Sequence, residues 1–171
     1  MKPRHLALRS GPIALALALA LLGALSISAC SMSPAAPMSA TPMARTTMMI
    51  LSGKLAGANE VPAVMSQGTG VVDASFNPST LVMTWKVTYS GLTGPASAAH
   101  FHGPAAAGQN AGVAVPVTSG LASPIIGSVT LTPAQAAELG AGKWYFNVHT
   151  VAYPGGEIRG QVTVQTAVTP G

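Results

Sequence analysis

The sequence predicts an all-β fold: an antiparallel β-sandwich, either Ig-like or a partly closed barrel, with one short helix. Short segments carry apolar residues at every second position, and Gly- and Pro-rich turns separate them. The clearest segment is 81–89, in which Met83, Trp85 and Val87 share one face. It follows a turn and is expected to pair with 70–76 as a hairpin. Further strands are predicted at about 49–56, 98–102, 113–118, 125–131, 143–150 and 157–165.

The one helix is predicted at 133–139. Thr132 is placed to cap its N-terminus, Pro133 suits the first helical position, and Gln135 completes a capping box. Gly140 is expected to end the helix in a left-handed conformation.

Residues 1–29 have the features of a cleaved targeting segment. Three basic residues precede an apolar run at 12–25, which is shorter than the roughly 18 residues that a membrane span needs. The run closes at Ile27-Ser28-Ala29-Cys30, which resembles the lipobox of bacterial lipoproteins. The resemblance implies that the Cys30 thiol is acylated, for example with palmitate, and becomes the mature N-terminus. The alternative is an ordinary signal peptide with an incidental cysteine.

The rest of the chain divides into a tether at 30–47, one domain at 48–165 and a tail at 166–171. The tether is rich in Pro, Ala, Ser, Thr and Met and lacks periodicity. After cleavage, five basic side chains remain against four acidic ones, which excludes a basic nucleic-acid surface. Ser31 resembles the outer-membrane sorting pattern of lipoproteins. We therefore expect a lipid-anchored envelope protein, on the periplasmic or surface face of a bacterial outer membrane.

Three histidines of the expected domain, His100, His102 and His149, are the candidate functional residues. Strand alternation directs Phe101, Phe146 and their apolar neighbours into the core, so the histidines take the opposite face. A hairpin closing through 153–156 would place Asn147 near Arg159 and His149 near Glu157. The sequence thus predicts a polar outer surface with an exposed Glu157–Arg159 ion pair.

Imidazoles from adjacent strands are close enough to bind one ion. Three neutral histidines suit copper or zinc, with nickel as a further candidate, and Asn147, Glu157 and Arg159 would support them. Two alternatives stay open: a polar network that fixes the 103–112 connection, and a partner-binding surface. No GxSxG elbow, phosphate loop or free thiol is present, so no enzyme is predicted.

Several phrases together resemble the CHRD (chordin-type) domain: Leu51-Ser52-Gly53, Asn59-Glu60-Val61-Pro62, AAHFHGPA, GSVTLTPAQAAELGAGKWYFNVHT and PGGEIRGQV. The resemblance spans about 48–164 and implies an all-β extracellular or envelope module. The positions that match its pattern are Glu60, Pro62, His100, His102, Asn147, His149, Thr150, Gly156, Glu157, Arg159 and Gly160. The expected function is a non-catalytic binding or structural module, and the alternative is a periplasmic copper- or zinc-binding protein.

Overall fold

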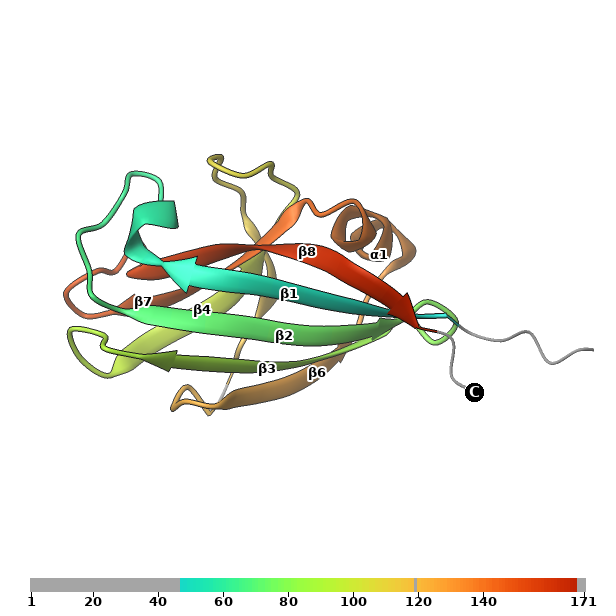
Figure 1. Ribbon diagram of the computed structural model, residues 1–171, viewed down its shortest axis with the longest axis horizontal. Coiled ribbons are helices and arrows are strands. Elements are labelled where there is room, and N and C mark those ends of the chain that lie inside the picture. The colour runs from blue at the N-terminus through green and yellow to red at the C-terminus, as the bar shows by residue number, and fades with distance from the viewer. Residues whose placement is uncertain (1–46, 119, 169–171) are drawn as a thin grey trace, which may run out of the picture. The chain divides into compact units, whose positions relative to one another are not determined.

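The computed structural model describes residues 47–118 and 120–168 (Figure 1). The predicted targeting segment, Cys30 and the tether up to residue 46 lie outside the described residues. The described elements are β1 (Met48–Ala56), a 3-10 turn η1 (Gly57–Asn59), β2 (Thr69–Asn77), β3 (Val82–Ser90), β4 (Ala96–His102), β5 (Val113–Pro116), β6 (Ile125–Thr130), α1 (Pro133–Gly140), β7 (Trp144–Thr150) and β8 (Ile158–Val168). Each predicted strand corresponds to an observed one.

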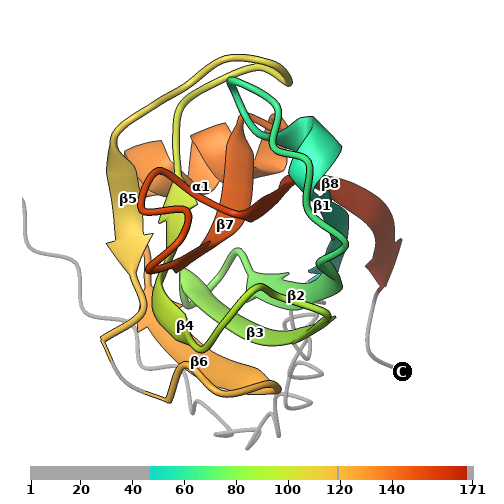
Figure 2. The same ribbon diagram turned by 90° about the vertical axis from the view of Figure 1, so that its left-hand side faces the viewer.

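The eight strands form one antiparallel sheet in the order β5-β4-β7-β8-β1-β2-β3-β6. The sheet curls on itself, as the end-on view of Figure 2 shows. Its two edge strands, β5 and β6, line one groove together but do not pair. The prediction of an antiparallel all-β fold with one short helix is confirmed, and of the two forms considered the partly closed barrel describes it.

Alternating residues of the strands fill the inside of the curl. Trp85, Phe101 and Phe146 pack edge to face there, with ring centroids 5.2 and 4.7 Å apart. Burying each such ring contributes about 1.5–3 kcal/mol, and the aromatic contacts add to this. The predicted hairpin is confirmed, since Phe76 pairs with Met83 and both are buried.

Helix α1 lies beside β8 and begins as predicted (Figure 1). Thr132 accepts a hydrogen bond from the Gln135 backbone, and the Gln135 side chain accepts one from Thr132. The helix ends one residue later than predicted, and the left-handed glycine lies two residues later than predicted. Gly140 is still helical, and Gly142 takes the left-handed conformation, with φ of 69°. The helix continues because Ala141 and Gly142 still bond to the carbonyls of its last turn.

Strand β8 extends to Val168, further than the predicted strand end at 165. The extension exists because Val168 pairs with Met48 at the start of β1, across an irregularity between Ile50 and Leu51. Among the described residues, no helix has the length and apolar character needed to cross a membrane.

Candidate metal centre

The three histidines lie on the outer face of β4 and β7, as strand alternation predicted. His100 and His102 on β4 pair with Asn147 and Tyr145 on β7. The predicted hairpin register is confirmed, because Asn147 pairs with Arg159 on β8. The polar side chains of three neighbouring strands therefore share one face.

This face is not the exposed polar surface that the sequence predicted. His102 and His149 are only 9% and 8% exposed, Asn147 is buried, and only His100 is partly accessible. The prediction of an exposed face was wrong because two connections fold back over this part of the sheet. One spans residues 103–112 and the other spans 151–157.

Arg159 and Tyr145 fasten the 103–112 connection. The Arg159 guanidinium donates to the Asn110 side chain at 2.8 Å and to the Gln109 carbonyl, and lies 3.4 Å from the centre of the Tyr145 ring. Tyr145 also contacts the histidine cluster, because His102 stacks on its ring with ring centroids 4.7 Å apart. Arg159 therefore contacts Tyr145, which in turn contacts His102. The hydrogen bonds of Arg159 hold the 103–112 connection in place over the histidines.

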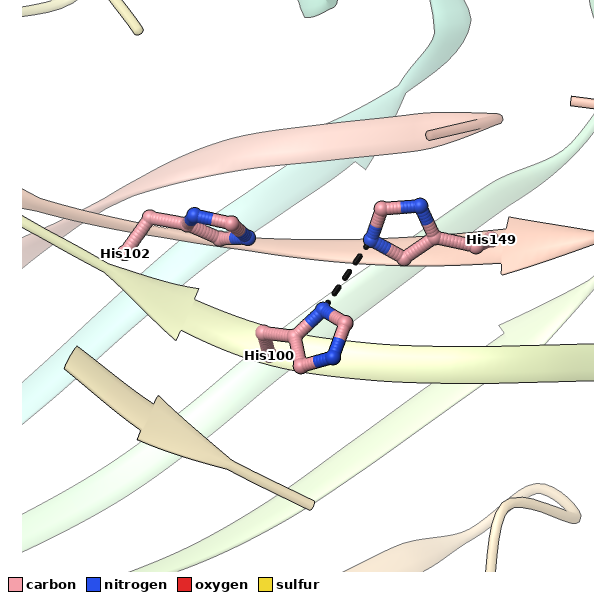
Figure 3. Close-up of side chains that lie close together, drawn as sticks. All are labelled: His100, His102 and His149. Atoms are coloured by element: carbon pink, nitrogen blue, oxygen red, sulfur yellow. Dashed lines mark hydrogen bonds between the residues drawn. The ribbon is translucent and has the colours of Figure 1, made fainter. Parts of the chain in front are cut away.

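The ring nitrogens of the three histidines point toward one another (Figure 3). One nitrogen from each of His100, His102 and His149 lies within 4.8 Å of the other two. Nδ1 of His100 is 3.1 Å from Nε2 of His149. Imidazoles on neighbouring strands therefore converge on one small region, as the ligands of a metal ion do.

The second ring nitrogens fix the tautomers of two histidines. Nδ1 of His102 is 3.0 Å from the Ala111 carbonyl, and Nδ1 of His149 is 2.9 Å from the Pro154 carbonyl. A carbonyl only accepts, so each Nδ1 carries the proton, and each Nε2 of the neutral ring presents a lone pair. A backbone carbonyl on the far nitrogen is the usual support of a metal-bound histidine.

The cluster also favours neutral rings. Burial lowers the pKa of His100, and the neighbouring His149 and His102 lower it further. Burial likewise lowers the pKa of His149, although the bond to Pro154 opposes this. Neutral imidazole is the form that binds a metal, so the lowered pKa values of His100 and His149 favour the metal-binding form of these two rings.

Two further residues complete the surroundings of the cluster. Oδ1 of Asn147 lies 3.0 Å from Nε2 of both His102 and His149. Glu60 is 7% exposed, and its Oε1 has no hydrogen-bond partner within the described part of the chain. Burial raises the pKa of Glu60 to about 7, against the lowering effect of Arg159. Sequence reasoning placed Asn147 near the site but identified Glu60 only as part of the family resemblance.

Glu157 does not form the predicted exposed ion pair. It is fully buried, and its carboxylate accepts hydrogen bonds from Ser66, from Thr150 and twice from Thr93 at 2.6–2.9 Å. Burial acts to raise its pKa, but these hydrogen bonds outweigh it and the pKa is lowered. Glu157 is therefore a structural anchor for Ser66, Thr93 and Thr150, whereas Nδ1 of His149 faces the Pro154 carbonyl.

These features define a small all-β domain with a covered three-histidine cluster on the outside of its sheet. A family model, the CHRD domain, matches residues 51–162, so the chain belongs to the CHRD domain family. Neither the comparison with curated proteins nor that with solved structures found a match.

Proposed function

We propose that this protein is a non-catalytic binding module of the cell envelope that holds a single copper or zinc ion through His100, His102 and His149. The observation that carries the proposal is the convergence of the three ring nitrogens within 4.8 Å. Two of the rings are locked by backbone carbonyls in the tautomer whose Nε2 faces the cluster. Such preorganisation exceeds what a simple hydrogen-bonded network needs.

A polar network that fixes the covering connections needs only the Nδ1 atoms of His102 and His149. They hold Ala111 and Pro154 and so fix both covering connections. The Nε2 atoms have no such role, since their nearest polar neighbours are another ring nitrogen and the Asn147 oxygen. A cation between these atoms would satisfy all of their lone pairs.

The test is calorimetric titration of Zn(II) and Cu(II) into the full chain, purified in detergent and stripped with a chelator. One ion should bind per chain, and His100→Ala, His102→Ala and His149→Ala should each weaken binding by at least about 10-fold. Met65→Ala is a matched control, because this thioether is 97% exposed and lies outside the cluster. Equal, weak binding by all of these proteins would reject the metal site and leave the polar network.

We further propose that Cys30 carries the lipid that anchors the domain to the outer membrane, on its periplasmic or surface face. The support is the lipobox-like sequence that ends at this only cysteine. Mass spectrometry of the mature N-terminal peptide should find Cys30 at position one with acyl chains attached. Cys30→Ser should release the protein from the membrane fraction, whereas an unmodified Cys30 in the wild type would refute the anchor.

A further inference from the structure

The position of Asn147 is not explained by three histidine ligands alone. Its Oδ1 lies 3.0 Å from two Nε2 atoms, those of His102 and His149. Both Nε2 atoms lack a proton in the neutral rings, because the protons are on the Nδ1 atoms that face Ala111 and Pro154. Three lone-pair atoms therefore meet at hydrogen-bond distance with no hydrogen between them. With neutral rings this arrangement is repulsive unless a cation lies among the three atoms or the amide is reversed.

A reversed amide would remove the repulsion by turning Nδ2 toward the rings, and an ionised Glu60 would disfavour that reversal because its carboxylate would then face Oδ1. A Cβ built on Gly156 would overlap with Oε1 of Glu60 and come within 2.8 Å of Nδ2 of Asn147. The amide nitrogen and the carboxyl oxygen thus border the same small space. Oε1 is the buried oxygen without a partner in the described residues, so it offers Nδ2 an acceptor on that side.

We propose that Asn147 supplies the fourth, oxygen ligand of the metal ion and that Glu60 is the residue that positions its amide. The proposal rests on the three-histidine site proposed above and adds to it a complete ligand set of three nitrogens and one oxygen.

Three of the six ligand separations fit such a set, and the three ring nitrogens lie within 4.8 Å of one another. Metal–ligand bonds of about 2.0–2.2 Å place neighbouring ligands of a tetrahedral ion about 3.3 Å apart. The separations of 3.0 Å between Asn147 and two rings, and of 3.1 Å between His100 and His149, are close to this value. A set with no sulfur and one amide oxygen favours Zn(II) or Cu(II) over Cu(I).

Two variants test Asn147 with Co(II) as a spectroscopic probe and Zn(II) for affinity, in the full chain. Asn147→Leu keeps the approximate volume and removes the oxygen, so Zn(II) affinity should fall about 10- to 100-fold and the visible Co(II) bands should shift. Asn147→Asp keeps an oxygen ligand and adds charge, so it should bind at least as tightly as the wild type with a changed spectrum.

Glu60 is tested with a matched pair. Glu60→Gln keeps an acceptor oxygen for Nδ2 and should leave the Co(II) spectrum unchanged. Glu60→Leu removes it, and should shift the spectrum and weaken Zn(II) binding about 10-fold. A role limited to packing would move the thermal midpoint of both variants without moving the spectrum.

The outcomes separate the two proposals. Wild-type binding and spectrum in Asn147→Leu, with loss of binding in the histidine variants, would overturn the oxygen ligand and leave the three-histidine site standing. If Asn147→Leu does not fold, an unchanged spectrum in Asn147→Asp overturns the ligand equally. No specific binding by the wild-type chain would overturn the proposed function and this inference together.

Discussion

Nδ1 of His100 and Nε2 of His149 lie 3.1 Å apart, although 49 positions separate the residues in the chain. Both rings have lowered pKa values, chiefly because of burial. A second proton on either ring would place a charge beside the other two imidazoles, so protons and a metal ion compete for the same nitrogens.

Metal affinity should therefore be pH-dependent with a low midpoint. The pKa values of His100 and His149 lie below 6.5, so Zn(II) affinity should be nearly constant from pH 7.5 to 6.5 and fall steeply below about pH 6. Calorimetric titration at half-unit pH steps measures this. Affinity that stays constant down to pH 4.5 would indicate carboxylate ligands and contradict the imidazole site.

Glu60→Gln should stabilise the protein in a pH-dependent way. The folded-state pKa of Glu60 is about 7, raised from 4.5 mainly by burial. Its contribution to stability is complete below pH 4.5 and is lost as the pH rises through 7, because the folded state then has to bury a charge. The variant should gain about 1–3 kcal/mol over the wild type at pH 8 and little at pH 4.5.

Denaturant unfolding of the metal-free proteins at both pH values measures this difference. Asp73→Asn is the control, because Asp73 is an exposed acid on β2. A Glu60→Gln effect that is the same at pH 4.5 and pH 8 would show that the charge of Glu60 is not involved.

Glu157→Ala should be strongly destabilising, by about 3 kcal/mol or more. It leaves the hydroxyl donors of Ser66, Thr93 and Thr150, of which Thr150 is the buried one, without their acceptor. Glu157→Gln keeps one acceptor oxygen and should cost less. Because the folded-state pKa is lowered, the wild-type contribution is present above pH 4.5 and is lost as the pH falls below that value. Equal stability of the two variants in thermal melts would contradict this role.

Gly156→Ala should disturb both stability and the metal site. Gly156 has φ of 125°, and an added Cβ would meet Glu60 and Asn147. We expect a loss of about 2–4 kcal/mol and weaker Zn(II) binding. Gly155→Ala is the matched control, since a Cβ there would meet nothing within 4 Å. Similar thermal midpoints for the two variants would refute the proposed close approach.

Much of the site could be predicted because strands alternate with a period of two. The positions of Phe101 and Phe146 fix the direction of the histidines, and matching of the core faces fixes Asn147 opposite Arg159. The capping box of α1 is equally local and was predicted with its residues. The end of α1 was not, because Gly140 and Gly142 both suit a left-handed position and only the completed last turn selects between them.

The sequence by itself determined the all-β class, the strands, the face that carries the histidines and the family resemblance that the CHRD domain model confirms. Only the tertiary structure decided that this face is covered, that Glu157 is an anchor, and that Glu60 lies beside Asn147. The physical reason is that connections such as 57–68 and 103–112 have no periodicity to reveal their path. Their position depends on hydrogen bonds to Arg159, Tyr145 and Glu157, which exist only once the sheet has formed.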